Sequence, residues 1–234
     1  MRFTKLNDDS SWLWEIDGIR VLVDPWFTES QIDLFPWFSE QYHINEQPEV
    51  DQIPKPDFIF ISHPFTDHCN KETLLKFSND IPVVANAHVL KKINKWGHFQ
   101  NLVPLLESPI SIDELKPKSK LDLVHSAFLL KSSQGNVLYA PHGTNIKLLP
   151  EVKILITTVS KYELPFWLGG TVNLGYEKAL ENLKRCKADW LLCTHDEQKR
   201  GKGLVEHLAK KNYKTFFEDP RIKLLKPGES FQGK

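Results

Sequence analysis

One stretch, residues 58–70, constrains this chain more than any other. It begins with four apolar residues in a row, which predict a buried strand. Two histidines and a carboxylate follow, at His63, Asp67 and His68. Asn70 is then a good N-cap for a short helix, so the polar loop lies at the carboxyl end of a strand, where functional sites are commonly built. Because imidazole and carboxylate are ligands of borderline and hard metal ions, the loop is a candidate metal site.

Several other apolar segments also end on a residue that can bind a metal ion or orient a ligand. These strand-end residues are Asp24, His125, His142 and His195. Histidine is the commonest metal-binding side chain, although any single one of these is more simply explained as a capped or surface histidine. Five histidines at strand ends, counted with the two of the first loop, favour a shared site.

The length and composition are those of an ordinary globular protein. With 234 residues, 41% of them hydrophobic and 26% charged, the chain suits one domain over residues 1–234. Basic and acidic residues number 30 each, which argues against nucleic acid as the main partner because phosphate binding usually needs a basic excess. No apolar run approaches the roughly 20 residues that span a bilayer, so no membrane association is expected. Three cysteines and a start without a signal-peptide core favour a cytoplasmic location.

The remaining pattern predicts a mixed α/β chain. Residues 11–23 are expected to form a hairpin about Asp17-Gly18, a dipeptide typical of tight turns. Residues 26–56 contain many aromatics without a sustained period and predict a long irregular excursion with at most one short helix. The other expected strands are 81–85, 102–106, 121–125, 128–131, 136–140, 154–156, 189–193, 214–218 and 222–225, and the expected helices are 88–96, 173–187 and 203–211.

Two aromatic segments, 26–43 and 162–168, are candidates for the walls of a substrate pocket. The side chains expected to line it are Trp26, Phe27, Phe65 and Trp167. Their rings favour an apolar or ring-bearing small molecule over a highly charged one. The alternative is that these aromatics anchor the two segments to the body of the protein.

The order of these features resembles the metallo-β-lactamase fold superfamily. The matching segments are the hairpin region 11–25, the loop 63–68, the pair Thr194-His195 and the closing run 226–229. The family signature on the loop is H-x-H-x-D-H, and this chain has phenylalanine, Phe65, in place of the second histidine. The resemblance implies a four-layer αββα sandwich, in which two mixed β-sheets are flanked by helices and the metal site lies in a groove at one edge.

The resemblance also implies a ligand set. One metal ion would take His63, the residue at position 65 and a third histidine, for which His125 is the candidate. The other ion would take Asp67, His68 and His195. An aspartate would bridge the two ions in the family, and His142 stands near the matching strand end in this chain.

Two departures argue against a standard two-metal site. Phe65 has no lone pair, and the neutral imidazole of His142 offers one lone pair where a bridging carboxylate offers two oxygens. The better preserved set consists of Asp67, His68 and His195, with His142 as a fourth ligand. This set suits one divalent ion, with Zn²⁺ favoured and Fe²⁺ or Mn²⁺ as alternatives. Two ions with altered ligands, or a metal-free hydrogen-bonded network, are the remaining alternatives.

The implied activity is hydrolysis by a metal-activated water. We expect Asp67 and His142 to act on the water or the substrate, and His63 and His125 to form a weaker second site or to carry protons. Asp24 is expected to orient a ligand through the loop, or else to serve only as a turn residue. The substrate would be a small ester, lactone, amide or phosphodiester. The runner-up is a catalytically inactive member of the fold that binds a ligand or a partner protein.

Overall fold

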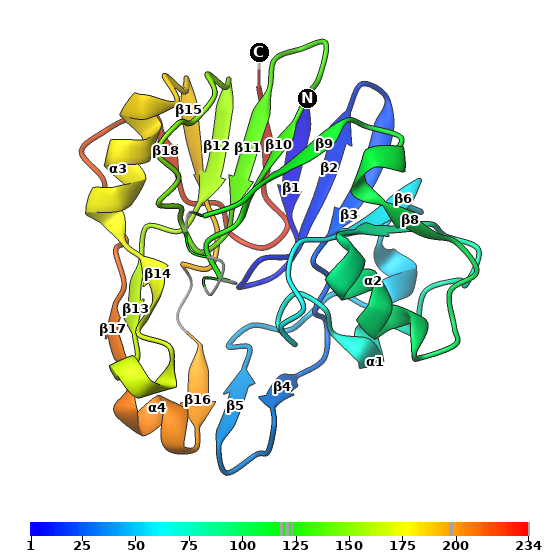
Figure 1. Cartoon of the computed structure of the whole chain (residues 1–234), viewed down its shortest axis with the longest axis horizontal. Helices are drawn as coiled ribbons and strands as arrows, with labels where there is room; N and C mark the ends of the chain where they lie inside the picture. The colour runs from blue at the N-terminus through cyan, green and yellow to red at the C-terminus, as the bar shows by residue number, and fades with distance from the viewer. Residues whose placement is uncertain (118, 120–121, 123, 197–198, 234) are drawn as a thin grey trace.

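The structure, a computed structural model, describes residues 1–117, 119, 122, 124–196 and 199–233. Two large mixed β-sheets pack face to face in it, and helices cover their outer faces (Figure 1). Helices α1 and α2 lie on one side of the sheet pair and α3 lies on the other. The four-layer αββα arrangement expected from the sequence is confirmed.

The first sheet has seven strands in the order β19-β1-β2-β3-β6-β7-β8. Its strands are β1 (Arg2–Lys5), β2 (Trp12–Ile16), β3 (Ile19–Val23), β6 (Phe58–Ile61), β7 (Val83–Ala85), β8 (Leu102–Pro104) and β19 (Ser230–Gln232). The predicted hairpin joins β2 to β3 through Asp17 and Gly18, whose φ angles of 51° and 82° lie in the left-handed region. From β3 to β8 the strands are parallel, so their carboxyl ends meet at one edge of the sheet.

The second sheet has six strands in the order β18-β15-β12-β11-β10-β9. Its strands are β9 (Ile112–Leu115), β10 (Ala127–Leu130), β11 (Val137–Ala140), β12 (Ile154–Thr157), β15 (Trp190–Cys193) and β18 (Ile222–Lys223). The expected three-strand meander exists, but its outer strand is β9 and not residues 121–125, of which 121 and 123 lie outside the described residues.

Two small sheets and seven short helices complete the described chain. The strands are β4 (Ser30–Asp33), β5 (Ser39–Tyr42) and β16 (Arg200–Lys202) in one small sheet, and β13 (Lys161–Glu163), β14 (Thr171–Leu174) and β17 (Lys210–Asn212) in the other. The helices are α1 (Lys71–Leu74), α2 (Ala87–Asn94), α3 (Tyr176–Arg185) and α4 (Leu204–Leu208), with 3-10 turns η1 (Val50–Gln52), η2 (Leu105–Glu107) and η3 (Phe166–Leu168). No helix of the described chain is long and apolar enough to span a bilayer.

The excursion predicted over residues 26–56 is more regular than its sequence indicates. It contains the hairpin of β4 and β5, which pairs with β16 from the far end of the chain. Mostly polar strands of four residues lack an apolar alternation, and the partner strand β16 supplies backbone hydrogen bonds that no local pattern reveals.

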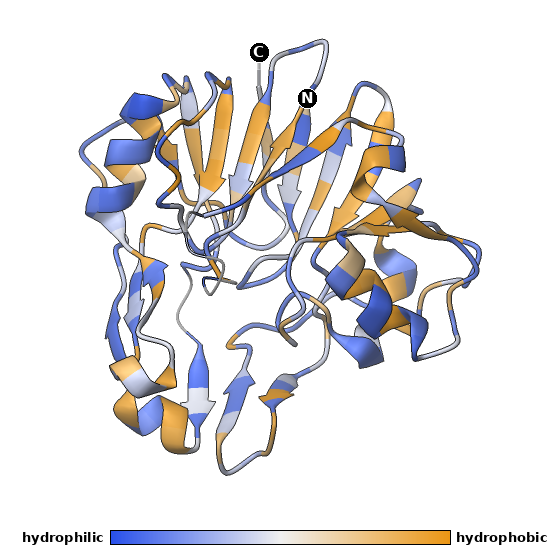
Figure 2. Cartoon of the chain, in the orientation of Figure 1, coloured by the Kyte–Doolittle hydropathy of each residue, from blue (hydrophilic) through white to orange (hydrophobic). Residues whose placement is uncertain are grey.

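The main core lies between the two large sheets. Trp14, Phe60 and Tyr139 meet there, and the rings of Trp14 and Tyr139 form an edge-to-face pair with centroids 5.2 Å apart. All four residues of β6 are buried because its other face packs against α1 and α2. Figure 2 shows the resulting hydrophobic strands in both sheets and the largely hydrophilic surface of α3. Burial on both faces explains why these strands are unbroken apolar runs.

The candidate site residues lie at the edge where the central strands of both sheets end. Asp24 follows β3 directly, and Ser62 and His63 follow β6. On the second sheet His142 lies just beyond β11, and His195 lies just beyond β15. Residues that are far apart in the sequence are thereby brought to one place.

Candidate metal centre

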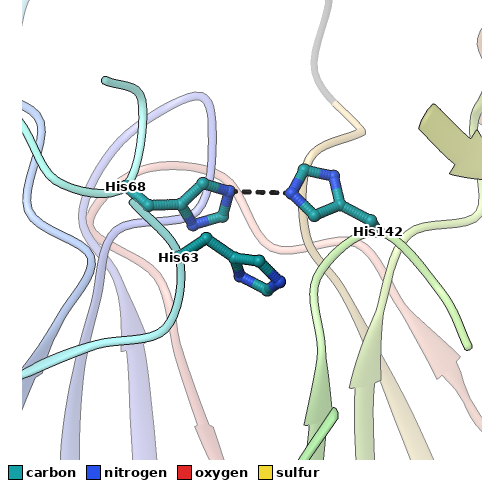
Figure 3. A group of neighbouring side chains, drawn as sticks. All are labelled: His63, His68 and His142. Atoms are coloured by element: carbon teal, nitrogen blue, oxygen red, sulfur yellow. Dashed lines mark hydrogen bonds between the residues drawn. The ribbon is translucent and has the colours of Figure 1, made fainter. Parts of the chain in front are cut away.

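Three histidines meet through their Nε2 atoms. The Nε2 atom of His68 lies 3.0 Å from that of His142 and 3.0 Å from that of His195. Figure 3 shows His68 and His142 facing each other across this contact, with His63 beside them. Two groups of described residues hold ligand atoms within 4.8 Å of one another, His63 with His68 and His142, and Asp67 with His68 and His195.

Each of the three facing rings has an oxygen beside its other nitrogen. The Nδ1 atoms lie 2.7 Å from Oδ2 of Asp24 for His68, 2.9 Å from Oδ1 of Asn173 for His142, and 2.6 Å from Oδ1 of Asp9 for His195. An acceptor at Nδ1 keeps the proton on that nitrogen and leaves a lone pair on Nε2, as in most metal-binding histidines.

The residues present fit a divalent ion. Lone pairs that face each other at 3.0 Å repel unless a positive charge lies between them. One proton on His68 serves only one of the two Nε2 contacts at a time, whereas a divalent cation accepts lone pairs from several nitrogens together. The carboxylate of Asp67, 3.7 Å from the Nε2 atom of His195, adds an oxygen of the kind found in mixed nitrogen and oxygen sites.

Asp24 is the most heavily bonded carboxylate of the centre. It is fully buried and accepts hydrogen bonds from the backbone N–H of Ser62 at 2.7 Å, from the Ser62 hydroxyl at 2.6 Å and from the Tyr139 hydroxyl at 2.7 Å, besides the ring of His68. Its φ angle of 44° lies in the left-handed region, a strained conformation that surrounding bonds must hold. Asp24 therefore does more in the structure than end a turn, since it fixes the ring of His68.

His195 is held by an ion pair that the sequence did not reveal. Its φ angle is 60°, and its partner Asp9 also lies 2.6 Å from the ammonium of Lys199. Burial opposes ionisation of Asp9, but His195 and Lys199 outweigh it and hold the pKa of this carboxyl well below its usual range. The local sequence indicates Asp9 only as part of a run of polar residues, 7–11, immediately before a strand. All five of these residues are buried.

The pKa of His68 is shifted in the opposite direction from the pKa values of His142 and His195. Burial opposes protonation of His68, but the carboxylates of Asp24 and Asp67 outweigh it and raise its pKa to about 9. Burial lowers the pKa of His142 well below its usual value, with neighbouring His195 as the next cause. Burial also lowers the pKa of His195, against the opposing effect of Asp9. Two of the three rings are therefore neutral near pH 7, as ligation requires.

His63 and Phe65 form the apolar side of the centre. The Nδ1 atom of His63 lies 2.8 Å from the Ser62 hydroxyl, and its ring stacks on Phe65 with centroids 6.0 Å apart. Phe65 also meets the ring of His142 edge-on at 6.2 Å. Burial, followed by the nearby charge of His68, lowers the pKa of His63. Position 65 thus supplies a hydrophobic wall and no ligand.

His125 lies outside both groups of ligand atoms, in contrast to its expected place at the first metal. Its Nδ1 atom is 2.9 Å from the carboxylate of Asp122, and its Nε2 atom is 3.1 Å from the carbonyl oxygen of Val172. Both ring nitrogens are therefore engaged by oxygens of the protein. The structure gives His125 the geometry of a buried structural histidine.

A cavity of about 60 Å³ opens beside the histidines. It is lined by Gln41, Asp67, His142, Ser160, Lys161, Tyr162, Val172, Asn173, His195, Lys199, Arg200, Lys211 and Tyr213. The position of Asn173 on β14, and not at the start of a helix as expected, is what brings it to this wall. No local pattern distinguished it.

The aromatics expected to line the pocket lie elsewhere. Trp26 is fully buried against the ring of His43, with centroids 3.8 Å apart, and Phe27 packs in the core beneath α1 and α2. Trp167 is 68% exposed on η3. The contacts of Trp26 and Phe27 are those of aromatics that anchor their segment to the body of the protein. Burial of a ring against the body stabilises the loop more than exposure in a wet pocket would.

Fold and centre together define a class, the metal-dependent hydrolases built on two stacked mixed sheets. A family model described as the β-lactamase superfamily domain matches residues 4–195. The chain therefore belongs to the metallo-β-lactamase superfamily. No curated protein sequence matches it.

Solved structures show the same fold at low sequence identity. An isothiocyanate hydrolase from gut bacteria of Delia radicum is 15% identical with a TM-score of 0.72, over 100% of this chain and 99% of that one. A possible metal-dependent hydrolase from Veillonella parvula is 10% identical with a TM-score of 0.69, over 99% and 98% of the two chains. A novel metallo hydrolase from Ignicoccus hospitalis is 17% identical with a TM-score of 0.64, over 100% and 99%.

Proposed function

We propose that this protein is a hydrolase that uses one divalent metal ion, with Zn²⁺ favoured over Fe²⁺ or Mn²⁺. Asp67, His68 and His195 would hold the ion, and His142 would supply a fourth ligand. The observation that carries the proposal is the pair of 3.0 Å contacts that the Nε2 atom of His68 makes with those of His142 and His195, each ring being fixed at Nδ1 by an oxygen.

A bound divalent ion supplies an activated water and polarises the scissile bond. The chain's own part is to hold and orient the ligands. The carboxylate of Asp24 fixes His68, and the amide oxygen of Asn173 fixes His142, so neither ring needs to rearrange during a turnover.

Asp67 and His142 both line the cavity, so a substrate that enters it would meet them. In this proposal a carboxylate oxygen of Asp67 accepts a proton from the attacking water and later returns it to the leaving group. Phe65 keeps bulk water away from one side of the rings, which strengthens the electrostatic contacts there. A small ester, lactone, amide or phosphodiester fits this chemistry.

Elemental analysis of protein purified without a metal-affinity tag is the most direct test. We expect about one equivalent of Zn, Fe or Mn, lost in His68→Ala and in His195→Ala because each removes a ligand. His88→Ala is the matched control, since His88 is exposed on α2 and its loss should leave the metal content unchanged. Activity should then appear in a panel of an ester, a lactone, an amide, a phosphodiester and an isothiocyanate.

The alternative is an inactive member of the fold that binds a ligand or a partner protein. Protein that contains no metal, and whose melting temperature does not rise when Zn²⁺, Fe²⁺ or Mn²⁺ is added, would support that alternative and overturn the proposal. A metal ion that binds only the native state raises the apparent stability of the protein. An unchanged melting temperature would therefore indicate that no ion binds.

A further inference from the structure

The cavity beside the histidines is lined mainly by cationic groups, although the whole chain has no net charge. Four cationic side chains line it, those of Lys161, Lys199, Arg200 and Lys211. Among the described residues only one lining side chain is a carboxylate, Asp67, and that group faces the histidines. The charged groups that line the cavity are therefore mostly hydrogen-bond donors.

The three lysines are tied to carboxylates that do not line the cavity. Lys199 lies 2.6 Å from Asp9, and Lys211 donates to Glu206 at 2.5 Å. The Nζ atom of Lys161 is 2.9 Å from a carboxylate oxygen of Glu163. An ammonium has three N–H donors, so each pairing fixes the position of the lysine and leaves donors for another acceptor.

Arg200 differs from the lysines. It is exposed on β16, and no carboxylate of the described chain pairs with its guanidinium. A guanidinium presents five donors in a rigid fork that matches the geometry of a carboxylate or a phosphate. An unpaired arginine that faces a cavity with three positioned lysines is the arrangement expected where an anionic oxygen group docks.

Two tyrosines complete the wall that the cations share, Tyr162 and Tyr213. Burial raises the pKa of Tyr162, so its hydroxyl keeps its proton and remains a donor. Tyr162 lies on β13 and Lys211 on β17, and these two residues face each other in the paired strands. Backbone pairing thus holds these donors in place before any ligand arrives.

We propose that this basic wall is a subsite for an anionic oxygen group, a carboxylate or a phosphate, that the substrate carries apart from its scissile bond. The inference rests on the proposed function for the position of the scissile bond beside the histidines. It replaces the apolar or ring-bearing substrate expected from the sequence with a charged one, because the expected aromatics do not line the cavity and four cations do.

The test compares two esters that differ in one anionic group, p-nitrophenyl acetate and the mono-p-nitrophenyl ester of succinate. In Arg200→Ala we expect kcat/KM for the succinate ester to fall about tenfold, mainly through KM, because a charge-assisted contact is lost. Hydrolysis of the acetate should change by less than about twofold. Arg200→Lys keeps the charge and should restore part of the loss.

Lys202→Ala is the matched control for charge alone. Lys202 lies on the same strand as Arg200, is also exposed and carries the same charge, but it does not line the cavity. Its removal should leave the ratio of the two esters unchanged. An equal effect of Lys202→Ala and Arg200→Ala, or an equal loss for both esters in Arg200→Ala, would overturn the subsite.

A binding measurement separates failure of the subsite from failure of the proposed function. Calorimetric titration of the metal-loaded protein with succinate should give a dissociation constant about tenfold weaker in Arg200→Ala. If neither ester is hydrolysed but this difference is found, the hydrolase proposal fails and the subsite stands. If succinate binding is unaffected by Arg200→Ala and is abolished by His68→Ala, the anion binds at the metal and the subsite is excluded.

Discussion

His68 and His125 are both buried histidines with a carboxylate beside Nδ1, yet their rings serve opposite purposes. Asp24 fixes His68 and leaves its Nε2 atom facing two other imidazoles. Asp122 fixes His125, but its Nε2 atom meets the carbonyl oxygen of Val172. In His68 the Nε2 atom faces only other imidazole nitrogens, whereas in His125 both ring nitrogens face oxygens.

This difference separates a candidate ligand from a histidine whose two ring nitrogens are both engaged by oxygens of the protein. Burial and a carboxylate partner are common to both rings and do not decide the matter. The decisive feature is the atom that faces Nε2. A carbonyl oxygen satisfies that nitrogen, whereas another imidazole nitrogen does not unless a cation lies between them.

Removing the carboxylate of Asp24, which fixes the candidate ligand His68, should have the largest effect. In Asp24→Ala the backbone N–H of Ser62 and three side-chain partners lose their acceptor. We expect the free energy of unfolding to fall by about 3–5 kcal/mol and metal affinity to fall about 10–100-fold. Denaturant unfolding and metal titration measure the two effects. The counterpart, Asp122→Ala, should leave metal affinity unchanged, and equal losses of affinity in both variants would remove the distinction between the two rings.

The next largest effect is expected at the ion pair behind His195. Asp9→Asn keeps the size of the side chain but removes the charge that faces both His195 and Lys199. Because outer partners of ligating histidines typically contribute tenfold or more to affinity, we expect a loss of about tenfold. Metal titration with a chromogenic chelator as competitor would show it. An unchanged affinity would mean that Asp9 stabilises the fold and not the ligand geometry.

Proton release on metal binding should distinguish His68 from its neighbours. Its pKa is raised to about 9, so without metal it carries a proton at pH 7 and must lose it to ligate. The lowered pKa values of His142 and His195 keep these rings neutral near pH 7, so ligation through Nε2 releases no proton from them. Below the raised pKa of His68, a proton competes with the metal ion for its Nε2 atom. The apparent metal affinity should therefore rise about tenfold per pH unit from pH 7 and level off near pH 9.

Calorimetric titration of zinc in buffers of different ionisation enthalpy would count these protons. We expect about one proton per ion at pH 7 and fewer than about half of one at pH 9.5. Release of no proton at pH 7 would show that His68 is already neutral, against the effect assigned to Asp24 and Asp67.

The smallest effect is expected on the structural side. His125→Gln should lower the free energy of unfolding by about 1–2 kcal/mol, because the contacts with Asp122 and Val172 are lost or lengthened. Metal content should stay the same and kcat should change by less than about twofold. A loss of metal that follows the loss of His125 would restore it as a ligand.

The parts of the fold that could be predicted from the sequence are those set by local pattern. The apolar run of β6 and the Asp17-Gly18 turn are readable because burial on both faces and a left-handed turn each restrict the residues that fit. The convergence of His68 and His195 followed from the resemblance of the chain to its family and from their places at strand ends.

The parts that could not be predicted depend on distant partners. Asp9 acquires its role only when β15 brings His195 to it, and the carbonyl that engages His125 belongs to Val172 on β14. The cavity wall of Arg200 and Lys211 likewise forms from two small sheets that the sequence pattern did not indicate. Such contacts are set by tertiary packing and leave no local trace.

The contact between residues 9–12 and the end of β15 has a consequence for how the protein is made. The hydroxyl of Thr194 donates to the carbonyl oxygen of Asp9, 185 residues earlier, and also accepts from the indole N–H of Trp12. Contacts at such separation form slowly, and on the ribosome the early residues wait until the late ones have emerged. In the proposed metal enzyme, ion uptake would therefore belong to the end of folding, because His195 joins His68 only after most of the chain has been made.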